Sequence, residues 1–132
     1  MDPRVQNFLS AKAFGVVGAS TDRAKFGNKV LRCYQQHGYR AIPIHPREKV
    51  IESLAAVAEV KDLPPEVEAL SIVTPPKVTE AVVDAAIASG IKHVWMQPGA
   101  ESADAIARAK AAGLNVIADG TCLLVTLGFD EG

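Results

Sequence analysis

At residues 89–96 the chain reads Ser-Gly-Ile-Lys-His-Val-Trp-Met, where a helical stretch ends at a glycine and an apolar run follows at once. Gly90 suits the left-handed backbone position just past a helix, where a side chain is costly, and the run after it has the length of a buried strand. The same junction recurs at Gly38 and Gly113, each again followed by an apolar run. The chain therefore repeats a unit of helix, glycine cap and strand.

Five apolar runs indicate strands, at residues 13–18, 39–44, 69–73, 91–96 and 114–118. Helices are expected at residues 28–37, 77–89 and 102–112, the last with Ser102 as its N-cap. A short amphipathic segment at residues 5–9 is expected to pack at the N-terminus, and one or two helical turns are expected within residues 48–65. Strands that alternate with helices imply a parallel sheet covered on both faces, because right-handed crossovers place the helices there. We therefore predict an α/β, Rossmann-like, doubly wound fold with a mostly parallel five-stranded sheet in a three-layer α/β/α arrangement.

Length and composition agree with this fold and exclude some functions. The chain has 132 residues, the usual size of one domain, so we expect a single domain over residues 1–132. Fourteen Lys and Arg against fifteen Asp and Glu give a net charge of −1 without a basic run, which argues against nucleic-acid binding. No apolar run approaches the ~20 residues of a membrane span, and two cysteines are too few for a disulfide-stapled secreted fold. We expect a cytoplasmic protein with no membrane partner and with reduced thiols.

In open parallel sheets ligands bind at the carboxyl ends of the strands, so the residues after each run are the candidates for a site. Small residues, prolines and hydroxyl side chains predominate there, which predicts a shallow crevice with exposed backbone groups that suits a nucleotide. The five strand ends are Gly18-Ala19-Ser20, His45-Pro46-Arg47, Thr74-Pro75-Pro76, Gln97-Pro98-Gly99 and Asp119-Gly120-Thr121-Cys122.

The first strand end has features of a phosphate site. Gly18 and Ala19 allow close backbone approach, the next helix starts near Gly27, and Arg23 and Lys25 add positive charge beside its N-terminus. The glycine spacing is neither Gly-x-Gly-x-x-Gly nor the Walker A pattern, so a purely structural strand-to-helix turn remains an alternative.

The second strand end helps to choose among nucleotides. An NAD site usually carries an Asp or Glu there for the ribose 2′-hydroxyl, whereas this chain has His45-Pro46-Arg47. A cation at that place favours a ligand with a phosphate on its adenosine ribose. NADP and coenzyme A both meet this condition.

Five ordered blocks of the chain resemble those of the small stand-alone CoA-binding proteins, which are similar to the N-terminal nucleotide-binding domain of the succinyl-CoA synthetase α subunit. The resemblance covers roughly residues 10–125. Its blocks are Gly15–Ser20, Ile42–Pro46, Val73–Pro76, Trp95–Gly99 and Asp119–Cys122.

This resemblance implies a Rossmann-like domain that binds coenzyme A through its ADP part. By position, the resemblance implies that the phosphates lie at the turn formed by Gly18, Ala19, Ser20 and Thr21, and that Arg47 or Lys49 supplies a cation. It also implies that Thr74 and Pro75 form a wall beside the adenine. The segment Met96, Gln97 and Pro98 is implied to belong to the site as well. The chain departs from the family at His45, where Asn or Ser usually precedes the proline, and at Thr121, where Arg or Lys often stands.

No catalytic constellation is recognisable at the strand ends. The order Ser-His-Asp, paired carboxylates, an activated Cys-His pair and zinc-ligand spacing are all missing, and the single acid at the strand ends is Asp119. In the synthetases that the chain resembles, the phosphorylated histidine belongs to a second domain, which we do not expect in a chain of 132 residues. We therefore expect non-catalytic binding of coenzyme A or acyl-CoA, and no enzyme.

Two alternatives remain: an NAD(P)-binding enzyme fragment, and a synthetase-like subunit module that needs a partner chain. For single residues, packing is the expectation for Cys33 and Trp95, and a reduced buried thiol for Cys122. A ligand contact is the alternative role of His45, which is otherwise a surface or hydrogen-bonded residue.

Overall fold

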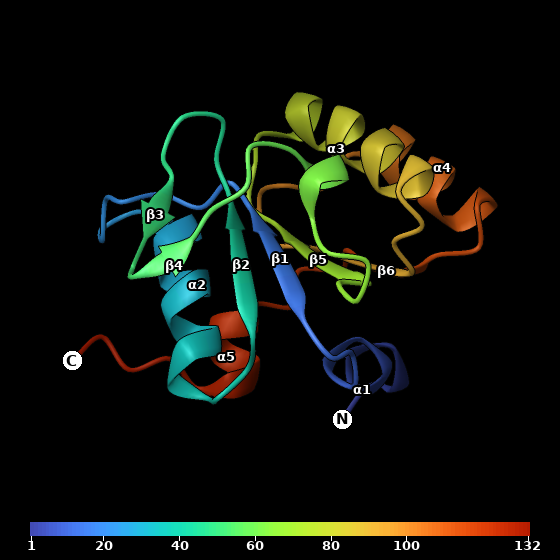
Figure 1. Cartoon of the computed structure of the whole chain (residues 1–132). Coiled ribbons are helices and arrows are strands. Elements are labelled where there is room, and N and C mark those ends of the chain that lie inside the picture. Colours follow the sequence, from blue (N-terminus) through green and yellow to red (C-terminus); the bar gives the residue numbers. More distant parts are fainter.

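A computed structural model describes all of residues 1–132 and contains one five-stranded parallel sheet (Figure 1). The strands stand in the order β2-β1-β5-β6-β7, and every neighbouring pair is parallel. Each lies inside one of the predicted runs, so the predicted fold is confirmed. Their bounds are Phe14–Val17 for β1, Ala41–Ile44 for β2, Ala69–Ile72 for β5, His93–Met96 for β6 and Asn115–Ile117 for β7.

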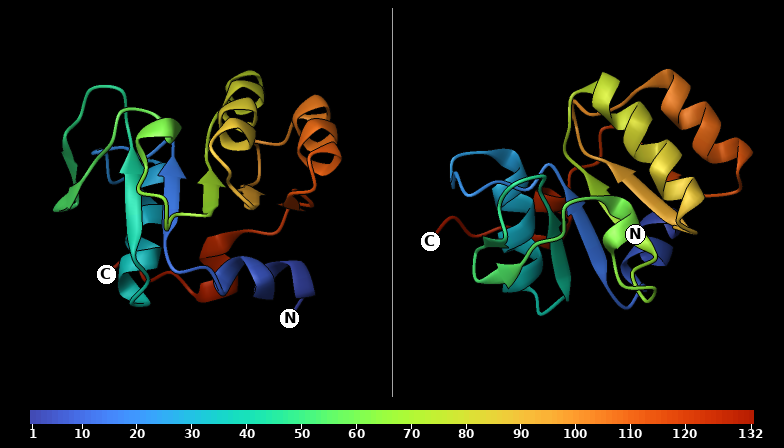
Figure 2. Two further views of the ribbon diagram at one scale, coloured as in Figure 1. Left: turned by 45° about the vertical axis from the view of Figure 1, so that its right-hand side comes forward. Right: turned by 45° about the horizontal axis from the view of Figure 1, so that its top comes forward.

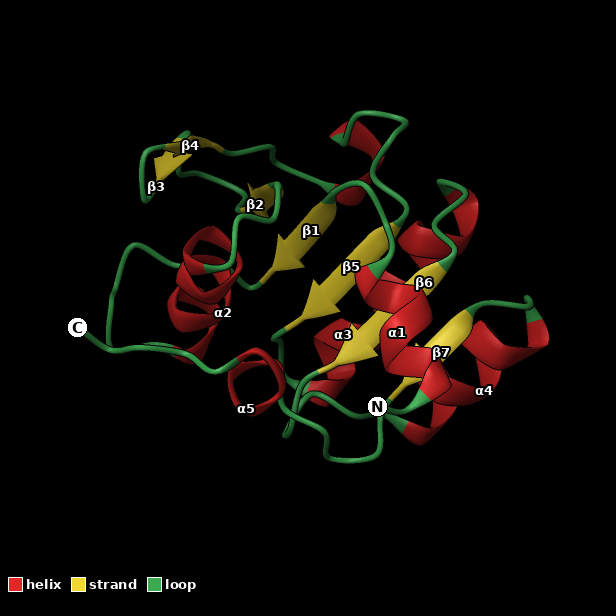
Figure 3. Cartoon of the chain, turned by 90° about the horizontal axis from the view of Figure 1, so that it is seen from below, coloured by secondary structure: helices red, strands yellow, loops and turns green.

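Helices cover both faces of the sheet, and Figures 2 and 3 show the two layers from other sides. One face packs against α1 (Pro3–Leu9), α2 (Phe26–Gln36) and α5 (Leu123–Leu127). The other packs against α3 (Pro76–Ala88), α4 (Ala103–Ala111) and the 3₁₀ turn η1 (Val60–Asp62). The helix α5 was not predicted, because its five residues are too few to show a periodic pattern.

The ends of the helices follow the predicted chemistry. Gly38, Gly90 and Gly113 have φ of 75°, 78° and 84°, the left-handed conformation expected just past a helix. The hydroxyl of Ser102 accepts a hydrogen bond from the Ala105 N–H at 3.2 Å and so caps α4. These local signals explain why the boundaries of the predicted helices lie within two residues of the observed ones.

Successive side chains along each strand point to opposite faces of the sheet, so the core forms two layers. Phe14, Val16 and Trp95 face α1, α2 and α5, whereas Val17 and Met96 face α3 and α4. The Trp95 indole is fully buried and donates to the Thr121 carbonyl at 2.9 Å, as expected of a packing residue. Cys33 is also buried, and burial raises the pKa of its thiol to about 11, so it stays protonated and packs as a small apolar group.

The expectation for residues 48–65 is corrected by the structure. In place of helical turns near Leu54 the chain forms a hairpin, β3 (Val50–Ile51) and β4 (Leu54–Ala55), and only η1 is helical. The hairpin turn needs positive φ at both central residues, and Glu52 and Ser53 adopt 50° and 67°. Neither residue type is typical of that conformation, so the sequence offered no turn signal.

The strand order locates the place where a ligand would bind. From β1 the chain passes to β2 on one side and later crosses to β5 on the other side. The carboxyl ends of β1 and β5 therefore flank the topological switch point, where open parallel sheets leave a crevice. None of the helices combines the length and the apolar character that a membrane span requires.

Candidate functional site

A cleft of about 420 Å³ opens at the carboxyl ends of β1, β2 and β5, beside the switch point. We call it the α3 cleft, because α3 forms one wall with Val78, Ala81, Val82 and Ala85. Residues 58–60 form the opposite wall and the ends of β1 and β2 form the floor. His45, Pro46 and Thr74 are also among its lining residues. The cleft is mostly apolar, with a few polar groups, which is the usual character of a site for a flat ring system.

A second cleft of about 270 Å³ shares Thr74 with the first. We call it the Pro98 cleft, and its lining residues are Phe26, Val73, Thr74, Pro75, Pro98, Gly99 and Ala100. The two clefts together extend from β2 across the switch point to the end of β6. An elongated ligand could therefore occupy both.

The loop between β1 and α2, residues 18–25, lies directly beside the α3 cleft. Gly18 has φ of 90°, and a Cβ there would lie 1.9 Å from the Val73 carbonyl oxygen. A Cβ on Gly27 would lie 1.9 Å from the Gly18 carbonyl oxygen. Only glycine fits at these two positions, because the loop packs closely against the end of β5 and the first turn of α2 there.

Free N–H groups gather on this β1–α2 loop and at the start of α2. The amides of Thr21, Arg23, Phe26 and Gly27 donate to no acceptor in the chain, and Lys25 caps α2 without a side-chain hydrogen bond. Unpartnered amides at a helix N-terminus, together with the helix dipole, favour a bound anion. This geometry suits a phosphate, as the sequence predicted for Gly18, Ala19, Ser20 and Thr21.

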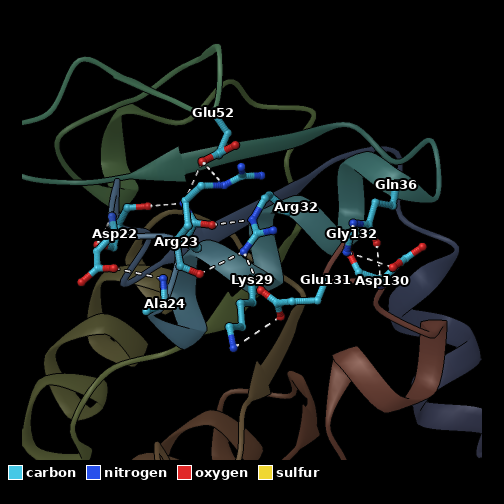
Figure 4. Close-up of polar contacts among 12 residues, drawn as sticks. Asp22, Arg23, Ala24, Lys29, Arg32, Gln36, Glu52, Asp130, Glu131 and Gly132 are labelled. Carbon is cyan, nitrogen blue, oxygen red and sulfur yellow. Dashed lines mark hydrogen bonds and ion pairs between the residues drawn. The ribbon is translucent and has the colours of Figure 1, made fainter.

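Two carbonyl groups of the same loop accept hydrogen bonds from Asn28 and Arg32, which the sequence analysis missed; Figure 4 shows Arg32 beside Arg23. The Asn28 side-chain amide donates to the Ser20 carbonyl at 2.7 Å and to the Glu52 carboxylate at 3.0 Å. Arg32 donates to the Arg23 carbonyl at 2.9 Å and to Asn28 Oδ1 at 2.6 Å. A signal for this role was the pair Asn28 and Arg32, two polar residues one turn apart near the start of α2, where their side chains can meet.

His45 closes the turn after β2. Its Nδ1 accepts hydrogen bonds from the N–H groups of Arg47 and Glu48 at 3.0 and 2.9 Å. An Asn or Ser oxygen can accept such bonds in a turn of this kind, which explains how His45 stands where the family usually has those residues. His45 is also one of the residues that line the α3 cleft.

Two substitutions of His45 test whether the turn needs only a hydrogen-bond acceptor at this position or needs the imidazole ring itself. We expect His45→Ala to lower the free energy of unfolding by about 1–2 kcal/mol, because the Arg47 and Glu48 amides lose their acceptor. His45→Asn should restore most of that loss. Urea unfolding of the two variants measures both values, and equal destabilisation by Ala and Asn would contradict the turn role.

Several cations near the clefts have no partner. Lys25, Arg47 and Lys49 are exposed and form no ion pair within the chain. Arg23, in contrast, lies 3.5 Å from Glu52. The unpaired cations are available to an anionic ligand without breaking an existing pair.

Other predicted residues lie outside the two clefts. Met96 and Gln97 are fully buried and line neither cleft, so of that segment Pro98 alone lines one. The side-chain Oε1 of Gln97 accepts from the Leu123 N–H at 2.9 Å, while Nε2 of the same amide has no partner. Cys122 is half-buried, is a free thiol and lines neither cleft.

Asp119 is engaged in holding its own loop. Its carboxylate accepts from the N–H and the hydroxyl of Thr121 at 3.1 and 2.6 Å and pairs with Arg4 at 3.0 Å. The Thr121 hydrogen bonds, with Arg4 as a smaller cause, lower the pKa of Asp119. The group therefore stays ionised at neutral pH and is poorly suited to proton transfer.

Comparison with known proteins identifies the family. Residues 12–127 match the CoA binding domain family. The chain belongs to this family. Over 88 residues, 66% of the chain, it is 30% identical to the acetate–CoA ligase [ADP-forming] II subunit alpha of Pyrococcus furiosus. The matched part is 19% of that subunit's length.

Solved structures agree with this assignment. A conserved hypothetical protein from Pyrococcus furiosus superposes with a TM-score of 0.83 at 35% identity, covering 87% of this chain and 98% of its own. A hypothetical protein from Pyrococcus horikoshii OT3 reaches 0.86 at 28% identity over 92% of this chain and 85% of its own. The dinucleotide forming acetyl-coenzyme A synthetase 1 of Ca. Korarchaeum cryptofilum, solved with phosphate and ADP, reaches 0.74 at 27% identity over 83% of this chain and 26% of that chain.

Proposed function

We propose that this chain binds coenzyme A or acyl-CoA through the ADP part, at the carboxyl ends of β1, β2 and β5. The proposal rests above all on one observation: the apolar α3 cleft lies directly beside a loop in which several N–H groups, among them those of Thr21 and Arg23, have no partner. An adenine ring would occupy the α3 cleft between α3 and residues 58–60. The diphosphate would then lie against the β1–α2 loop, where the glycines allow close approach.

The rest of the ligand has a place in the same arrangement. Because the two clefts share Thr74, the pantetheine arm would run from the diphosphate into the Pro98 cleft. The ribose 3′-phosphate would meet Arg47 or Lys49, whose side chains are unpaired. Family membership and the two cleft shapes thus support the same ligand.

Charge reversal at Arg47 tests the contact with the 3′-phosphate. We expect Arg47→Glu to weaken the binding of coenzyme A about 10-fold and the binding of dephospho-CoA by no more than about 3-fold. The reason is that a charge-assisted hydrogen bond contributes about 1.5–3 kcal/mol, and only coenzyme A has the 3′-phosphate. Titration calorimetry of the variant with both ligands measures the difference. Equal weakening of the two ligands would reject this role for Arg47.

We further propose that binding is non-catalytic. The acid at the strand ends, Asp119, is committed to Thr121 and Arg4, and Cys122 and Gln97 line neither cleft. His45, Glu59 and Thr74 do line the α3 cleft, but no hydrogen bond joins any two of them. No nucleophile is therefore paired with a positioned base there. The protein would present or sequester the coenzyme rather than transform it.

Titration of the purified protein with coenzyme A, acetyl-CoA, NAD⁺ and NADP⁺ tests the function. We expect heat of binding from the two CoA ligands alone. Binding of a nicotinamide nucleotide without binding of coenzyme A would overturn the proposal and favour the alternative of an NAD(P)-binding enzyme fragment.

A second candidate is a module that acts with a partner chain. The observation in its favour is that the chain matches only 19% of the ligase subunit and 26% of the synthetase chain. Affinity purification from the native cytosol, with identification of co-purifying chains, tests it. Recovery of a stoichiometric synthetase-like chain would support this candidate.

A further inference from the structure

The C-terminal segment, residues 128–132, lies along α2 and is bound to it at three places (Figure 4). Gln36 donates to the Asp130 carbonyl at 2.6 Å and accepts from the Asp130 N–H at 3.0 Å. The Glu131 carboxylate lies 3.4 Å from both Lys29 and Arg32. The Phe129 ring centre lies 5.0 Å from the Arg32 guanidinium carbon, within range of a cation–π interaction.

Arg32 belongs to this contact and to the β1–α2 loop at once. Its Nη2 lies 2.9 Å from the Arg23 carbonyl and 3.4 Å from Glu131, and its Nε donates to Asn28. The side chain is about 7% exposed, so its charge depends on these partners. A displacement of residues 129–131 would leave Arg32 with the loop carbonyl and Asn28 as its only partners.

The hairpin on the other side of α2 completes the support of the loop. Glu52 accepts from Asn28 at 3.0 Å, and the Glu52 carbonyl accepts from Gln35 at 2.9 Å. Glu52 and Ser53 are the two non-glycine residues with positive φ in the chain. Such strain persists where surrounding contacts determine the conformation, and it clusters at sites with a function.

We propose that Arg32 is a positioning residue that couples docking of residues 129–132 to the shape of the β1–α2 loop. With the Ser20 and Arg23 carbonyls held toward Asn28 and Arg32, the free N–H groups stay available for the phosphates. Docking of the segment and occupation of the loop then stabilise each other, because coupling between two binding events is reciprocal. The ligand part of this inference rests on the proposed function, whereas the coupling within the chain does not.

Hydrogen exchange measured by mass spectrometry, together with CoA titration, tests the coupling. In Phe129→Ala/Glu131→Gln we expect the hydrogen-bonded amides of Asp22, Ala24 and Lys25 to exchange at least ~3-fold faster without ligand. We also expect CoA to bind about 5-fold more weakly. In the unchanged protein, added CoA should slow exchange in residues 129–132, an effect that a merely structural role for Arg32 would not produce. The single exposed change Glu131→Gln should give about half of the effect and keeps the test valid if the double variant is unstable.

Glu68→Gln is the matched control, because it removes an exposed ion pair, Glu68 to Lys92 at 2.9 Å, next to the opposite end of the sheet. It should leave both readouts unchanged. Unaltered loop exchange in both segment variants would overturn the coupling. So would a Glu68→Gln control that changes loop exchange and CoA affinity as much as the segment variants do. If the unchanged protein binds no CoA while loop exchange still depends on the segment, the coupling stands and the proposed ligand is wrong.

Discussion

Ala81→Phe is expected to weaken coenzyme A binding at least ~30-fold while leaving the thermal midpoint within about 2 °C. Ala81 is exposed on α3 and forms part of the wall of the α3 cleft. A phenyl ring there would fill the space proposed for the adenine without entering the core. The loss corresponds to about 2 kcal/mol of binding free energy.

The matched control is Ala107→Phe, the same change at an exposed position of α4 that lines neither cleft. It should leave the affinity unchanged. Calorimetric titration of both variants, with circular dichroism melting for the fold, gives the comparison. Tight CoA binding by Ala81→Phe would mean that the adenine does not occupy the α3 cleft.

Gly27→Ala is the second change with a large expected effect. Alanine is ordinarily favoured over glycine within a helix by about 1 kcal/mol. Here the added Cβ would lie 1.9 Å from the Gly18 carbonyl oxygen, a backbone atom that cannot move without moving the β1–α2 loop. We therefore expect a net loss of about 2–3 kcal/mol in the free energy of unfolding and a loss of CoA affinity of about 100-fold.

Gly38→Ala serves as the control for Gly27→Ala. Gly38 has φ of 75°, but a Cβ there meets no atom within 4 Å. The expected cost is about 1 kcal/mol, from the backbone conformation alone, with unchanged affinity. Urea unfolding and calorimetry separate the two variants, and a Gly27→Ala protein that is as stable and binds as well as the native chain would contradict the close packing.

The fold could be predicted from the sequence because its signals are local. Gly38, Gly90 and Gly113 mark helix ends two or three residues before β2, β6 and β7. The apolar run of five or six residues that follows each glycine leaves little choice for the position of the strand. The hairpin at Glu52 and Ser53 could not be predicted in this way. Its positive φ values are sustained by contacts with Gln35 and Asn28, which lie far away in the sequence.

The candidate site was predictable only in part, for the same physical reason. Residues that act through the backbone, such as Gly18, and residues at strand ends, such as Thr74, follow from the strand positions, and both line the α3 cleft. Met96 is the last residue of β6 and packs in the core against α3 and α4. Gln97 follows the strand, but its side chain is buried and accepts from the Leu123 N–H, so neither residue lines a cleft. The contact of Arg32 with Glu131 joins positions 99 residues apart, which no local pattern can reveal.

A crystal structure of the chain with coenzyme A tests the central claim most directly. We predict that the adenine lies in the α3 cleft, the diphosphate within about 3 Å of N–H groups in the β1–α2 loop, and the 3′-phosphate beside Arg47 or Lys49. Coenzyme A bound away from the carboxyl ends of β1, β2 and β5, or clefts left empty at saturating coenzyme A, would contradict the proposed site.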